Sequence, residues 1–117
     1  MNDSLGANVR SGTLEVLELL ADLRAQRAYE RDVPIEDVPA ELVCMWFDDM
    51  HHPEDPAHHR AFDASERQVL AEFHEFFSKH VDDLPQCGDV AKLHATPIWH
   101  EIVSHAKAAL RGFREAS

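Results

Sequence analysis

The sequence predicts an all-α protein, a compact bundle of four to five helices in a single domain. Apolar residues recur at spacings of three and four over several long segments, which is the period of a helix face packed on a core. Acidic residues and prolines stand just before or within the first turns of these segments, as is typical of helix N-termini. At 117 residues the chain has the length of one domain and can bury one ordinary hydrophobic core.

The first predicted helix begins at Thr13, a residue suited to the N-cap, and runs to about Tyr29. Its leucines recur on one face that should lie in the core, and its early glutamates and late arginines complement the helix dipole. Residues 1–12 are polar and contain Gly6 and Gly12, so we expect a flexible lead. Residues 13–117 then form the single helical domain.

A proline-containing connector leads to a second helix that should end at about Met50. Pro39 suits its first helical position, with Asp37 or Val38 before it as the cap. A short strand over residues 43–47 is the alternative, because β-branched and aromatic residues fit a strand. Apolar and polar residues do not alternate there, which favours the helix.

The later elements are predicted from their start signals. We expect a loop from His51 to Phe62, and a loop of this length in a compact domain is often functional. The sequence Asp63-Ala-Ser-Glu66 is a capping box, and the helix that it opens carries an aromatic stripe that should be the centre of the core. After a turn at residues 85–88, Asp89 should cap a short helix, and Thr96-Pro97 should start the last one.

Charge is the most informative bulk property. The formal net charge is −11, and nine acids against one base lie between Glu30 and Asp55. A field this negative repels nucleic acid and anionic membranes, whereas it accelerates encounter with basic proteins. An acidic excess also serves solubility, but uniform scatter would fit that role better than this clustering does. We therefore expect a protein partner, with no nucleic acid and no membrane.

The candidate partner-binding surface lies in and around the second helix. It consists of carboxylates that must stay hydrated or meet cations, together with one tryptophan. The tryptophan is either a core residue or an exposed anchor of the kind found at interface hot spots, and the sequence leaves that choice open. The candidate residues are Glu36, Asp37, Glu41, Trp46, Asp48, Asp49, Glu54 and Asp55.

Histidines in the predicted loop suggest an alternative function. Imidazoles close to carboxylates suit zinc or nickel, and a catalytic zinc needs only three protein ligands. The alternative is thus a metal-binding protein or a small metalloenzyme. Its candidate ligands are His51, His52, His58 and His59. No catalytic motif is present elsewhere, so the favoured class is non-enzymatic and has no cofactor.

The expected location is a reducing cytoplasm. Cys44 and Cys87 do not make a disulfide framework, and Cys44, among apolar residues, should be an inert core thiol. The N-terminus lacks the basic and apolar regions of a secretion signal. No stretch approaches the roughly 18 continuous apolar residues of a membrane span.

The run from Val38 to Asp55, with Trp46-Phe-Asp-Asp49 at its centre, is followed by the helix that carries Phe73 and Phe77. This arrangement resembles small acidic immunity proteins of bacterial contact-dependent inhibition and polymorphic-toxin systems. The resemblance implies a cytoplasmic protein that binds and neutralises a cognate toxin domain, and the acidic charge independently favours a basic toxin or nuclease domain. Such families differ in fold and surface, so no functional residue is transferred from them. A homodimeric adapter or regulatory domain is a third possibility.

Overall fold

A computed structural model of the chain describes residues 4–33, 37–50, 54–85 and 88–116. Within these residues the protein is helical and contains no strand, which confirms the all-α prediction. A π-helical turn extends the third helix over Met45–Met50, and a 3₁₀ turn over Val81–Asp83 follows the fifth. The seven α-helices of the described residues are α1 (Ser4–Leu20), α2 (Leu23–Asp32), α3 (Val38–Cys44), α4 (Pro56–Ala61), α5 (Ala64–His80), α6 (Val90–His94) and α7 (Pro97–Ala116).

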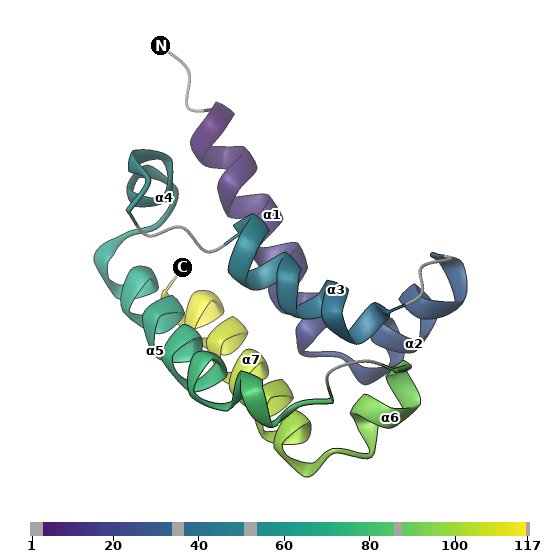
Figure 1. The fold of residues 1–117 in the computed structure, drawn as a ribbon. Helices are drawn as coiled ribbons and strands as arrows, with labels where there is room; N and C mark the ends of the chain where they lie inside the picture. Colours follow the sequence, from purple (N-terminus) through teal and green to yellow (C-terminus); the bar gives the residue numbers. More distant parts are fainter. Residues whose placement is uncertain (1–3, 34–36, 51–53, 86–87, 117) are drawn as a thin grey trace.

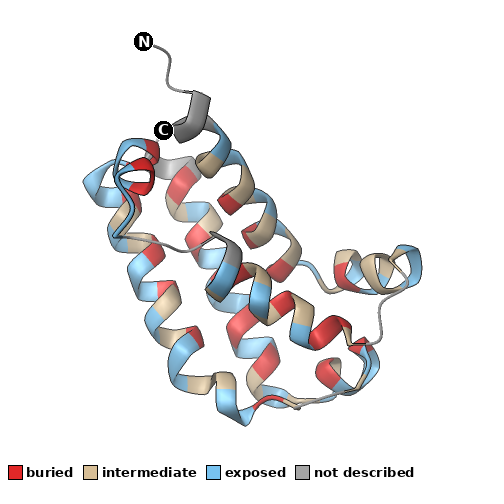
Figure 2. Cartoon of the chain, turned by 45° about the horizontal axis from the view of Figure 1, so that its top comes forward, coloured by how far each residue is buried: buried red, intermediate tan, exposed pale blue. Residues whose placement is uncertain are grey.

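Three long helices form the body of the molecule (Figure 1). Helix α5 packs on α7, and α7 packs on α1. Helix α4 and the π-helical turn also pack on α1, and α3 lies across it in the view of Figure 1. Helices α2 and α6 contact one another at one end of the bundle. Figure 2 shows that buried residues recur at intervals along the long helices.

Aromatic side chains from different helices meet in the core. The rings of Trp46 and Phe73 pack edge to face with centroids 4.9 Å apart, and Phe77 lies 6.2 Å from Trp99. All four side chains are buried. Edge-to-face pairs add to the stabilisation that burial of such large side chains supplies. The prediction that the α5 aromatic stripe lies in the core is confirmed.

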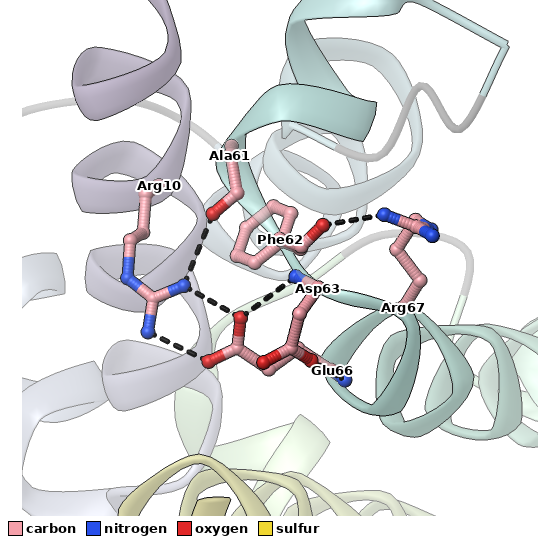
Figure 3. A network of polar contacts seen from close by, with 6 residues as sticks. All are labelled: Arg10, Ala61, Phe62, Asp63, Glu66 and Arg67. Atoms are coloured by element: carbon pink, nitrogen blue, oxygen red, sulfur yellow. Dashed lines mark hydrogen bonds and ion pairs between the residues drawn. The ribbon is translucent and has the colours of Figure 1, made fainter. Parts of the chain in front are cut away.

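The prediction that the first helix starts at Thr13 is wrong, whereas the flexible lead expected over residues 1–12 stays a prediction. Helix α1 begins at Ser4, and Thr13 is buried in its middle. Figure 3 shows the reason, since Arg10 on α1 reaches the start of α5. Its guanidinium donates to both carboxylate oxygens of Glu66, at 2.8 and 2.7 Å, and to the Ala61 carbonyl at 3.0 Å. A contact between residues so distant in sequence stabilises the early turns of α1, and no local pattern indicates it.

The predicted helix from Thr13 to Tyr29 is interrupted at Ala21–Asp22. The side chain of Asp22 accepts hydrogen bonds from the backbone N–H groups of Arg24 and Ala25, so it caps a new helix, α2. A helix end leaves backbone carbonyls without partners. Here the Gln26 amide donates to the carbonyls of Leu19 and Leu20, at 3.0 and 3.1 Å. The break is therefore stabilised on both sides.

Gln26 also joins three segments of the chain through its side-chain oxygen. The Trp99 indole N–H donates to this oxygen at 3.0 Å, and His94 Nε2 lies 2.8 Å from it. Because the oxygen is an acceptor, His94 carries a proton on Nε2. Gln26 is fully buried, so each of these bonds satisfies a polar group removed from water. The network holds α2 against α6 and α7.

The helical prediction for the segment after the connector is confirmed, and the strand alternative is wrong. Asp37 caps α3 by accepting from the N–H of Ala40 at 3.1 Å, and Pro39 lies in the first turn. The helix continues into the π-helical turn and ends at the predicted Met50. Leu42 and Trp46, one turn apart, are fully buried. Helical periodicity was therefore the better guide here than β propensity.

The described part of the predicted loop from His51 to Phe62 contains a helix. The Asp55 side chain accepts from the N–H of Ala57 at 2.9 Å, and Pro56 occupies the first turn of α4. The capping box of Asp63 and Glu66 and the start of α7 at Pro97 are confirmed. The added α4 and the division of the first helix raise the count above the predicted four to five.

Candidate functional site

The described carboxylates of the predicted surface lie on consecutive elements of the chain. They belong to the start of α3, the π-helical turn and the segment that leads into α4. Asp48, Glu54 and Asp55 are exposed, whereas Asp37 and Glu41 are half-buried. Glu36 and the side chain of Asp49 lie outside the described residues. We call the described members, Asp37, Glu41, Asp48, Glu54 and Asp55, the acidic strip.

Trp46 does not belong to this surface, because its side chain is 0% exposed. Its indole N–H donates to Nδ1 of His74 at 3.2 Å, which requires that this nitrogen carry no proton. Burial lowers the pKa of His74, so the neutral form that accepts this bond is favoured. Of the two roles that the sequence left open for Trp46, the structure supports the core residue.

Members of the acidic strip differ in what they do within the fold. Asp37 and Asp55 cap α3 and α4, so each of these carboxylates is already engaged by a backbone N–H. Burial and, to a smaller extent, the Glu41 carboxylate raise the pKa of Tyr29, which places Glu41 near α2. Asp48 and Glu54 are the exposed members without a capping role.

An apolar groove of about 200 Å³ lies between α3 and the segment that connects α5 to α6. Its lining includes Pro39, Val43 and Cys44 on one side and Val81 and Leu84 on the other. Cys44 is exposed and forms no disulfide, so the prediction of a core thiol is wrong. Helix α3 turns Leu42 into the core, and this leaves Cys44 on the outer side.

One acidic residue of this region was missed by sequence reasoning. Asp82, in the 3₁₀ turn after α5, lines the groove opposite α3 and is exposed. Its neighbour Asp83 is also exposed, and its carboxylate lies 3.4 Å from Nδ1 of His80. The chain separation between Asp82 and α3 explains the omission, because only the packed fold brings α3 and the 3₁₀ turn to opposite sides of one groove. The groove thus has a mainly apolar lining, and Asp82 is the acidic residue that lines it.

The four histidines proposed as metal ligands do not all fall within the described residues. His51 and His52 lie outside them, His58 is buried in α4, and His59 is exposed. The ring of His58 packs against Phe62 with centroids 5.0 Å apart, and burial lowers the pKa of His58. Within residues 4–33, 37–50, 54–85 and 88–116, no group of three His, Cys, Asp or Glu side chains is arranged to hold a metal ion.

Comparisons with protein-family models, curated proteins and solved structures found no match to the chain. In the part of the chain that the structure describes, no helix combines the length and the hydropathy that a membrane span requires.

Proposed function

We propose that the chain is a non-enzymatic protein-binding module that docks a basic protein on its acidic strip. The observation that carries the proposal is the apolar groove between α3 and the 3₁₀ turn, which is lined by the exposed Asp82 and by the helix to which Asp37 and Glu41 of the acidic strip belong. Interface hot spots commonly consist of an apolar anchor in a pocket, surrounded by polar residues that exclude water. The groove could accept one such anchor side chain from the partner.

Charge supports a basic partner. The chain has a formal net charge of −11, and the acidic strip belongs to the segment from Glu30 to Asp55 in which nine acids face one base. Complementary charge accelerates association and suppresses binding of acidic competitors. A toxin or nuclease domain with a basic active site fits this description. The proposal is therefore an immunity protein of the bacterial cytoplasm that blocks such a domain, consistent with the resemblance of the segment from Val38 to Asp55.

The proposal is tested by neutralising the acids that have no capping role. The variant Asp48→Asn/Glu54→Gln/Asp82→Asn removes two exposed carboxylates of the acidic strip and the exposed carboxylate that lines the groove. Asp37 and Asp55 are left unchanged because their loss would also destabilise α3 and α4. The tagged wild-type chain is used to capture partners from a host extract, and each captured protein is purified and titrated against both forms. We expect a basic partner whose affinity falls at least about tenfold in the variant.

A control of equal net charge separates docking from bulk electrostatics. The variant Glu15→Gln/Glu75→Gln/Glu101→Gln removes three exposed carboxylates on α1, α5 and α7. We expect it to bind nearly as well as the wild type, and we expect the wild-type affinity to fall as salt is added. Equal loss in the two triple variants, or an affinity insensitive to salt, would contradict the assigned surface. A captured partner that is itself acidic would contradict the proposed function.

A further inference from the structure

A second groove, of about 720 Å³, lies beside the break between α1 and α2 and is formed by α1, α2 and α7. The end of α1 contributes Glu18, the start of α2 contributes Leu23, and the C-terminal half of α7 contributes Leu110. The volume is within the range of roughly 300 to 1,000 Å³ that is typical of small-molecule sites.

The lining of this groove is basic although the protein is acidic. Arg24, Arg27, Lys107 and Arg111 line it, which is four of the 11 lysines and arginines of the chain. All four are exposed, and none forms an ion pair with a described residue. These four cations share one groove although the chain has 22 acids. They leave a local positive charge that a ligand can neutralise.

The other polar groups of the lining restrict which ligand fits. Asp22 accepts from two backbone N–H groups at the start of α2, so its carboxylate is already engaged. Glu18 is exposed and can accept a hydrogen bond from a hydroxyl or amino group. Leu23 and Leu110 add apolar surface for an organic group. Three arginines present planar forks, which match phosphate oxygens better than a lysine can.

The geometry points to a binding site for a small organic phosphate, a molecule that carries phosphate groups beside an apolar or ring-shaped body with hydroxyl or amino groups. Arg27, Arg111 and their neighbours hold the phosphates, Glu18 accepts from the polar groups of the body, and the two leucines contact its apolar part. This site is separate from the acidic strip, so it does not depend on the proposed docking function.

The test is a calorimetric titration of the full chain with ATP, inorganic tripolyphosphate and adenosine. We expect ATP to bind, tripolyphosphate to bind more weakly, and adenosine alone to give no measurable heat. The variant Arg27→Gln/Arg111→Gln should weaken ATP binding at least about tenfold, because two charge-assisted contacts are lost. The control Lys79→Gln/Lys92→Gln removes the same charge at two other exposed positions and should leave ATP binding within about twofold. Circular dichroism verifies that both variants are folded.

Three outcomes would overturn the inference. The first is an absence of ATP binding up to about 10 mM, which is weaker than any specific site of this kind should be. The second is equal weakening in the two double variants, which would indicate attraction to net charge alone. The third is binding of a glutamate-rich peptide in preference to ATP and tripolyphosphate, lost in the Arg27→Gln/Arg111→Gln variant. That result would assign the groove to an acidic protein segment instead of a phosphate ligand.

Discussion

The ion pair between Arg10 and Glu66 is predicted to be a main determinant of stability at the junction of α1 and α5. Replacing Arg10 with methionine keeps a side chain that can pack near Phe62 and Phe113, whose rings lie 5.6 Å from the guanidinium carbon. It removes both hydrogen bonds to the Glu66 carboxylate, whose side chain is only 7% exposed. A buried carboxylate without a cation is strongly unfavourable.

The magnitude follows from the burial of the two side chains. Breaking a fully buried ion pair costs about 3 to 5 kcal/mol, and we take the lower end because the Arg10 side chain is 35% exposed. The Arg10→Met variant should therefore lose about 3 kcal/mol of unfolding free energy. Glu66→Gln should lose less, about 1 to 2 kcal/mol, because water can hydrate the released guanidinium and glutamine can still accept from the Asp63 N–H. The double variant should lose less than the sum of the single losses.

Urea unfolding followed by circular dichroism measures these differences. The Arg10 hydrogen bonds lower the pKa of Glu66 in the wild type, whereas burial alone would raise it in Arg10→Met. The stability that the pair contributes is therefore present above the ordinary glutamate pKa and is lost as the pH falls through the folded-state pKa. The difference in unfolding free energy between the wild type and Arg10→Met should become smaller below about pH 4.5.

The matched control is Arg24→Met, which removes an exposed arginine and should change stability by no more than about 0.5 kcal/mol. A loss in Arg10→Met below about 1 kcal/mol, or a gap that does not change with pH, would refute the reasoning.

Three further predictions concern other parts of the fold. Burial lowers the pKa values of His58, His74 and His94, so the unfolded chain takes up protons before the folded chain does as the pH falls. The urea concentration at the unfolding midpoint should therefore be lower at about pH 5.5 than at about pH 7.5, and a midpoint that does not change would contradict this. Gln26→Leu should cost about 1 to 3 kcal/mol in urea unfolding, because it leaves the buried Trp99 indole N–H and the Leu20 carbonyl without the partner that Gln26 supplies. Gly88→Ala should lower thermal stability by about 1 kcal/mol, because Gly88 has φ +137°, and an unchanged melting temperature would contradict that reading.

Structural features that depend on residues within one or two helical turns, such as helix caps, were predicted well from the sequence. Asp37, Asp63 and Asp89 each accept a hydrogen bond from a backbone N–H two or three residues inside the helix that they precede. The aromatic stripe of α5 was also predicted, because its period depends only on local geometry. These features need no knowledge of the rest of the chain.

Features that depend on contacts between distant segments were not predicted. The early start of α1 depends on Arg10 meeting Glu66, and the break at Asp22 is stabilised by Gln26, which also bonds to Trp99. Asp22 is a residue type that can cap a helix, but it lies within a continuous helical pattern, and that pattern predicted one uninterrupted helix. Helix α4 is short and holds two adjacent histidines, so its periodicity was too brief to indicate a helix.

The same distinction applies to the candidate site. The acids between Glu30 and Asp55 are conspicuous because they are close together in the sequence. Packing decides that Trp46 is buried, that Cys44 is exposed, and that Asp82 lies across a groove from α3. A count of charges could therefore locate the region, but it could not identify which side chains surround the groove.

The Gln26 side chain has a consequence for how the molecule assembles. Its oxygen bonds to His94 and Trp99, which lie 68 and 73 positions later in the chain. This oxygen therefore lacks these partners until α6 and α7 have docked. Closing a loop of that length is entropically costly and occurs late when it is not assisted by nearer contacts. The junction of α1 and α2 should therefore become rigid only when the two ends of the chain meet, which couples the first and last helices into one cooperative unit.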